Sequence, residues 1–141
     1  MKGRVMAVDP GEKRLGIAVS DPSGTIANPL TVIQHVARLV DAATIAQLAS
    51  TNEVVLIVVG QPLDSDGNVG PASRKASRLA EAIRSQTNIP VVLWDESGST
   101  LKASEMLTRM GSVRRKNRSK LDALAATVIL QDFLDAQSAR I

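Results

Sequence analysis

An uninterrupted apolar run at residues 54–59, Val-Val-Leu-Ile-Val-Val, constrains the fold of this chain more than any other feature. Consecutive β-prone side chains without a polar residue are typical of a strand that is buried on both faces of a sheet. The two neighbouring segments, residues 36–50 and 72–86, instead place their apolar side chains at helical spacing. A buried strand between two helices predicts an α/β sheet that is covered by helices.

The order of the other segments predicts the topology. Residues 4–9, 15–20 and 30–34 are β-rich and separated by turn residues, so they predict an antiparallel hairpin that continues as a meander. Further along, residues 60–71 predict a loop, residues 90–94 a strand, and residues 100–110 and 121–136 two helices, with a basic linker at residues 112–120. Together they predict one α/β domain over residues 1–141. Its mixed β-sheet has a leading hairpin or meander, then α/β crossovers, with helices flanking both faces.

The composition excludes several kinds of chemistry. The chain has no cysteine and one histidine, which rules out disulfides, thiolate catalysis and cysteine-based zinc sites. We therefore interpret His35 as a residue at the start of a helix. One Trp and one Phe are the only aromatic residues, so base stacking on aromatic side chains is not expected. The strand-like N-terminus is too short for a signal peptide, and no apolar run is long enough for a membrane span. We expect a soluble cytoplasmic protein with no membrane partner.

Positive charge is concentrated in one segment. The whole chain carries +3, but residues 102–120 contain seven basic residues and one acid, so this window carries +6 and the rest carries −3. A basic cluster on a mildly acidic body predicts contact with a polyanion such as nucleic acid. The alternative interpretation is a basic loop that is simply solvated.

Acidic residues occupy three places that a sheet could bring together. Asp9 ends the first strand, Asp95 and Glu96 follow the strand at residues 90–94, and Asp122 lies one turn inside the last helix. A two-metal nuclease clamps the scissile phosphate with two divalent ions that lie about 3.5–4 Å apart. Carboxylates are the side chains that hold these ions. Adjacent strand residues point to opposite faces, so we expect only one of Asp95 and Glu96 to be a ligand.

Each acidic position also has a purely structural explanation. Asp9-Pro10-Gly11 is favourable turn chemistry, and Asp95 could cap the next helix. Ser119-x-x-Asp122 matches a helix capping box. The basic residues just before Asp122 favour the functional explanation, because a nuclease needs cations to hold the flanking phosphates.

Five segments, in order, resemble the YqgF/RuvX family. Residues 9–21 resemble its opening Asp-x-Gly hairpin, residues 24–30 the segment that follows, Gly60-Gln61-Pro62 with Gly67 its Gly-x-Pro loop, Asp95-Glu96 the start of its Asp-Glu-Arg motif, and residues 121–131 its C-terminal helix. The match is collinear over almost the whole chain. The resemblance implies a ribonuclease H-like fold related to RuvC. It also implies an endonuclease acting on structured nucleic acid, either Holliday junctions or the precursor of 16S ribosomal RNA.

The resemblance also implies a site. Asp9, Asp122 and one acid of the Asp95-Glu96 pair, preferably Glu96, would hold Mg²⁺ or Mn²⁺. The residues expected to bind the substrate backbone are Lys13, Arg14, Arg114, Arg115, Lys116, Arg118 and Lys120. Nothing in the sequence marks a dimer interface, although a four-way junction requires two cuts and a homodimer would supply them.

One departure from the family pattern motivates other hypotheses. Ser97 stands where the family has the arginine of Asp-Glu-Arg, and serine cannot replace the planar fork with which arginine binds phosphate. Beside the endonuclease, the second hypothesis is therefore a non-catalytic nucleic-acid-binding or ribosome-assembly factor. The third is an actin-like nucleotide-binding domain, suggested by Asp9-x-Gly11 followed by Gly16. Such ATPases need two domains, and 141 residues supply one.

Overall fold

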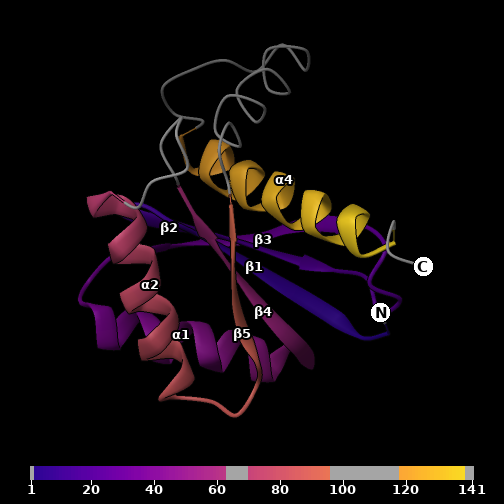
Figure 1. Cartoon of the computed structure of the whole chain (residues 1–141), viewed down its shortest axis with the longest axis horizontal. Coiled ribbons are helices and arrows are strands. Elements are labelled where there is room, and N and C mark those ends of the chain that lie inside the picture. Colours follow the sequence, from indigo (N-terminus) through magenta and orange to yellow (C-terminus); the bar gives the residue numbers. More distant parts are fainter. Residues whose placement is uncertain (1, 63–69, 96–117, 139–141) are drawn as a thin grey trace.

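A computed structural model describes residues 2–62, 70–95 and 118–138 (Figure 1). Within these ranges the elements follow the predicted order. The strands are β1 (Arg4–Pro10), β2 (Arg14–Ser20), β3 (Ala27–Gln34), β4 (Val54–Gln61) and β5 (Val91–Asp95), and the helices are α1 (Arg38–Thr51), α2 (Pro71–Arg84) and α4 (Arg118–Ser138).

The strands form one mixed sheet in the order β3-β2-β1-β4-β5. β1 pairs antiparallel with β2, and β2 pairs antiparallel with β3, so the first three strands form the predicted meander. β4 lies parallel to both β1 and β5; α1 lies in the connection that leads into β4, and α2 in the connection from β4 to β5. The predicted fold class is confirmed, and the apolar run from which it was inferred is β4, an interior strand between β1 and β5.

The helices cover the two faces of the sheet separately, with α4 on one face and α1 and α2 on the other (Figure 1). Side chains alternate between the faces along a strand, and β1 shows this directly. Val5 and Ala7 pack in the core beneath α4, whereas Met6 and Val8 pack in the core beneath α1 and α2. Asp9 is next in this alternation and therefore faces α4.

Several element boundaries differ from the predicted ones. β4 continues through Gly60 and Gln61 because both pair with β5, so the loop predicted at residues 60–71 begins later. α2 begins at Pro71, since proline at the first helical position gives up no helical hydrogen bond. α4 begins at Arg118, so Ser119 lies inside the helix, and the capping-box interpretation of Asp122 is wrong. The helix predicted at residues 100–110 lies outside the described ranges.

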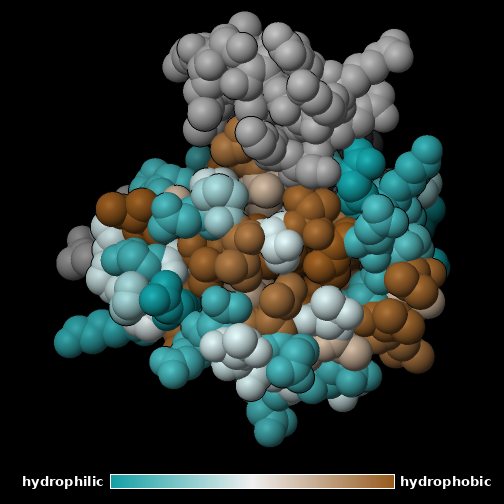
Figure 2. All heavy atoms as spheres, turned by 180° about the vertical axis from the view of Figure 1, so that it is seen from behind, coloured by the Kyte–Doolittle hydropathy of each residue, from teal (hydrophilic) through white to brown (hydrophobic). Residues whose placement is uncertain are grey.

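The described surface exposes a few large apolar side chains. Val36, Leu39 and Val40, around the start of α1, are 69%, 63% and 48% exposed. Figure 2, a view from behind, shows apolar side chains gathered in the middle of that face with hydrophilic ones around them. None of the described helices is both long enough and apolar enough to cross a membrane.

Candidate functional site

Asp9 lies near the end of β1, where the buried part of the strand reaches the β1–β2 turn. It is paired with Gly16 of β2 in the antiparallel register. The alternation along β1 directs its side chain toward α4, and the residue is partly buried rather than solvated. The sequence placed Asp9 at a strand end, and the structure adds the face of the sheet on which it lies.

At Gly16 the backbone of α4 comes into close contact with the sheet. A Cβ atom built on Gly16 would lie 2.0 Å from the carbonyl oxygen of Asp122 and 2.5 Å from its carbonyl carbon. The backbone of α4 at Asp122 therefore rests directly on β2, in space that only glycine leaves free. Opposed Cα atoms in an antiparallel pair are about 5 Å apart, so Asp122 is also brought next to the strand that carries Asp9.

The packing role of Gly16 does not follow from the sequence pattern around it. Its only local signal is an isolated glycine inside a β-rich segment, which is typical of a close backbone approach. Nothing in that pattern says that the approaching segment is the last helix.

Asp122 is held by a specific ion pair with Arg14. The Arg14 Nε donates a hydrogen bond of 2.7 Å to Asp122 Oδ2, and the two side chains are 30% and 29% exposed. Arg14 opens β2 and lies on the same face as Gly16, since the two are separated by one residue. A pair this exposed contributes at most about 1 kcal/mol to stability. Its main consequence is that the carboxylate of Asp122 is oriented.

Asp95 lies on the other face of the sheet. In β5, Val92 and Trp94 pack against the core beneath α4, whereas Val91 and Leu93 belong to the core beneath α1 and α2. Alternation therefore places the side chain of Asp95 on the face opposite to Asp9, although the residue ends its strand at the same edge of the sheet. Glu96 lies outside the described ranges.

The oxygen donors that the structure brings together suit a hard divalent cation. Mg²⁺ takes oxygen ligands and is usually held by one or two carboxylates with waters and substrate phosphates, so Asp9 and Asp122 fit it. In the part of the chain that the structure describes, no group of three metal-ligating side chains occurs. A third protein ligand would have to come from the remaining residues, which include Glu96.

Of the predicted phosphate-binding residues, the structure describes two fully. Arg14 contacts Asp122, and Lys13 is exposed in the turn between β1 and β2. The backbones of Arg118 and Lys120 lie at the start of α4 as described, four and two residues before Asp122. The side chains of these two residues, together with all of Arg114, Arg115 and Lys116, lie outside what the structure describes.

Comparison with known sequences assigns a family. The RuvX family model, described as Holliday junction resolvase, matches residues 3–136. A relative from Thermoanaerobacter pseudethanolicus is 39% identical over 135 residues, which cover 95% of this chain and 97% of that protein. Another from Syntrophus aciditrophicus is 42% identical over 135 residues, covering 96% and 90%. Both carry the name "Putative pre-16S rRNA nuclease".

Solved structures share the fold at low sequence identity. T. thermophilus RuvC in complex with a Holliday junction substrate superposes with a TM-score of 0.60 at 15% identity, covering 96% of each chain. The Fowlpox virus resolvase in complex with Holliday junction DNA gives a TM-score of 0.59 at 9% identity, covering 95% of this chain and 98% of that one. The fold is therefore that of RuvC-like resolvases. Since a family model spans nearly all of the sequence and relatives near 40% identity align over almost their full length, this chain belongs to the RuvX family.

Proposed function

We propose that the chain is a metal-dependent endonuclease that hydrolyses phosphodiester bonds in structured nucleic acid by a two-metal mechanism. The observation that carries this proposal is the contact between Gly16 and the backbone of Asp122. It places Asp122 of the last helix beside the pair of strands in which Asp9 lies near the end of β1. The core between α4 and the sheet is apolar, and Gln131 contacts the backbone of Thr25 and Ala27 further along the helix, so two acids of the described residues stand together only at this junction.

Asp9, Asp122 and Glu96 would hold Mg²⁺ or Mn²⁺. Such ions, when bound, supply an activated water and neutralise charge on the scissile phosphate. Glu96 is preferred to Asp95 because strand alternation puts Asp95 on the opposite face from Asp9. Arg14 would act as a positioning residue, since its hydrogen bond orients the carboxylate of Asp122.

The basic residues at the start of α4 support a polyanionic substrate. The described part of α4 begins with the segment Arg118 to Lys120, and the start of a helix favours anions because the positive end of its dipole lies there. A phosphate backbone passing this helix end would be stabilised by it. With Lys13, Arg14, Arg114, Arg115 and Lys116, these residues would give an affinity that falls as salt is added.

Two substrates are candidates for this site. The family model and the structural neighbours point to Holliday junctions, whereas the names of the sequence relatives point to the 5′-end maturation of pre-16S ribosomal RNA. Both are structured nucleic acids found in the bacterial cytoplasm, where we expect the protein to act. Junction resolution needs two cuts and would be carried out by a homodimer.

A paired cleavage assay tests the proposal. Wild type, Asp9→Asn, Asp122→Asn and Glu96→Gln are incubated with a four-way DNA junction and with a pre-16S RNA fragment, each with Mg²⁺, Mn²⁺ or EDTA. Losing a metal ligand should lower cleavage at least about 100-fold, because loss of even the outer partners of such ligands costs 10–100-fold. Asp95→Asn is the matched control, since it removes one carboxylate at the same sheet edge on the other face, and it should retain most of the activity.

The second candidate function is a nucleic-acid-binding factor without turnover, motivated by Ser97 at the arginine position of the family motif. It is distinguished in the same assay. Tight binding of either substrate by wild type and Asp9→Asn, with no metal-dependent cutting by wild type, would refute the nuclease. Ser97→Arg would then be the variant to make, since regained cleavage would locate the missing group.

A further inference from the structure

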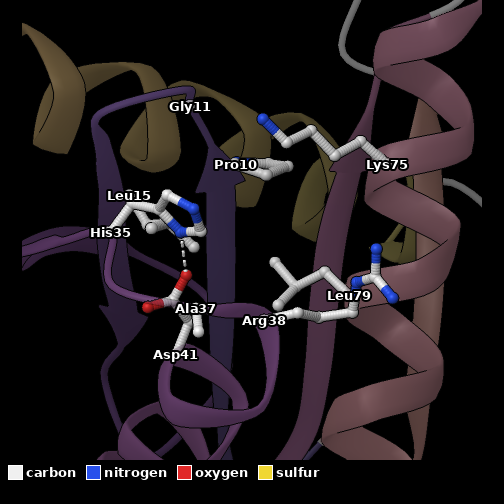
Figure 3. A pocket seen from close by; sticks show the side chains of 9 residues that line it. All are labelled: Pro10, Gly11, Leu15, His35, Ala37, Arg38, Asp41, Lys75 and Leu79. Atoms are coloured by element: carbon white, nitrogen blue, oxygen red, sulfur yellow. Dashed lines mark hydrogen bonds and ion pairs between the residues drawn. The ribbon is translucent and has the colours of Figure 1, made fainter.

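A cavity lies at the same end of the sheet as Asp9 but on the opposite face. Its volume is about 200 Å³, and it opens between the β1–β2 turn, the start of α1 and the middle of α2 (Figure 3). Pro10 and Gly11, which directly follow Asp9, form one wall. The cavity is therefore separated from the candidate active site only by the end of β1.

The floor of the cavity is apolar. Leu15 and Leu79 are 2% and 5% exposed and belong to the core beneath α1 and α2, and Pro10 and Ala37 complete this part of the lining. Cavities for drug-sized ligands usually measure 300–1,000 Å³. The smaller volume here is enough for one small ring system of the size of a nucleobase.

The rim of the cavity is positively charged. Lys75 extends from α2 across the mouth toward Pro10 and Gly11, and Arg38 extends from α1 toward α2 (Figure 3). Neither side chain forms an ion pair with any residue that the structure describes. Lys75, whose ammonium lies beside Pro10 and Gly11, is a cation without an acidic partner among the described residues at this opening, which favours an anionic ligand, and phosphate accepts charged hydrogen bonds from lysine.

A fixed histidine faces these cations from the other side of the cavity. His35 Nδ1 lies 2.5 Å from Asp41 Oδ2, and Asp41 Oδ1 accepts a hydrogen bond of 3.0 Å from the backbone N–H of Val36. The Asp41 side chain is only 4% exposed, so these contacts satisfy its buried oxygens. Because Nδ1 is engaged by the carboxylate, Nε2 of His35 is left to hydrogen-bond a group in the cavity.

We infer that this cavity binds one nucleoside monophosphate unit. The base lies on Leu15 and Leu79 with a hydrogen bond to His35, and the phosphate is held by Lys75. The unit is either a free mononucleotide or an unpaired nucleotide of a nucleic-acid strand. The second source rests on the proposed function, because a strand that crosses the Pro10-Gly11 turn from Asp9 would reach the cavity with its neighbouring nucleotide.

The test measures binding without metal, so that it does not depend on cleavage. The four 5′-nucleoside monophosphates and a single-stranded hexanucleotide are titrated in EDTA into ¹⁵N-labelled protein that carries Asp9→Asn. Lys75→Ala removes the phosphate contact, and Ala37→Phe fills the cavity from an exposed position. Arg74→Ala is the matched control, because it removes the same charge from the adjacent exposed position of α2, which does not line the cavity.

Binding of at least one mononucleotide should weaken about tenfold or more in Lys75→Ala, as expected for loss of a charged hydrogen bond, and should disappear in Ala37→Phe. Arg74→Ala should change it little. If the loss of affinity in Lys75→Ala and Ala37→Phe is confined to the hexanucleotide and absent for a hexanucleotide that lacks its central bases, the inference holds, with a nucleic-acid strand as the source of the nucleotide. Equal affinities of Lys75→Ala, Ala37→Phe and Arg74→Ala for every probe would overturn it, whatever the outcome of the cleavage assay.

Discussion

Replacing Gly16 by alanine would disturb the contact on which the candidate site depends. The new methyl group would lie 2.0 Å from the backbone oxygen of Asp122, and real Cβ contacts are essentially never shorter than 3.0 Å. Neither partner can rotate away, because both belong to the backbone of a regular element. The start of α4 must therefore move from β2 by about 1 Å.

The loss of folding free energy in Gly16→Ala can be worked out from this clash. Over-packing a well-filled interface costs about 1–3 kcal/mol, and a backbone clash belongs at the upper end. Alanine regains about 0.5–1 kcal/mol through its lower entropy in the unfolded chain, so the net loss is about 2 kcal/mol. The entropy of unfolding of 141 residues is about 0.3 kcal/mol/K, so the Tm should fall by about 7 °C.

Thermal melting and the cleavage assay measure the two consequences. A shift of about 1 Å in Asp122 relative to Asp9 should lower cleavage about 100-fold at a temperature where the variant is fully folded. Gly70→Ala is the matched control, because no atom lies within 4 Å of its added Cβ, and its Tm should change by less than about 3 °C. If Gly16→Ala and Gly70→Ala have the same Tm and the same cleavage rate, α4 does not rest on Gly16 and the argument for the site is wrong.

Three other substitutions test separate parts of the structure. Arg14→Gln should lower cleavage about tenfold in steady-state assays while changing stability by less than about 1 kcal/mol, because Arg14 orients Asp122 through a partly exposed ion pair; unchanged cleavage would remove this role. Ile129→Ala should cost about 3 kcal/mol in urea denaturation, since Ile129 is fully buried between α4 and the sheet, and a loss below about 1 kcal/mol would contradict that packing. Asp21→Asn tests the β2–β3 turn, where hydrogen bonds from the backbone N–H of Ile26, the Ser23 hydroxyl and the backbone N–H of Thr25 lower the pKa of Asp21. A lowered pKa stabilises the fold above the unfolded-state pKa of about 3.9 and loses that effect as the pH falls toward the folded-state value. The Tm difference between wild type and Asp21→Asn should therefore be present at pH 7 and shrink below about pH 4, and a constant difference would show that the charge is not its origin.

Much of the fold is determined by local sequence. The order of strands and helices follows from residues that interact within one turn or one strand, and the apolar run that became β4 predicted a sheet with helices on both faces. The position of Asp9 at a strand end followed from the same patterns. The errors fall at boundaries such as Gly60 and Ser119, where pairing with β5 and the earlier start of α4 outweighed turn and capping preferences.

The site itself was decided by tertiary structure. Arg14 and Asp122 are 108 positions apart, and their contact exists only because α4 packs across β2 at a glycine. The face on which Asp95 lies depends on the register of β5, and the pairing of His35 with the buried Asp41 depends on how the chain enters α1. The physical reason is the same in each case. Side-chain type and spacing fix which residues can do chemistry, whereas the distances between them depend on packing across the sheet, which no local pattern contains.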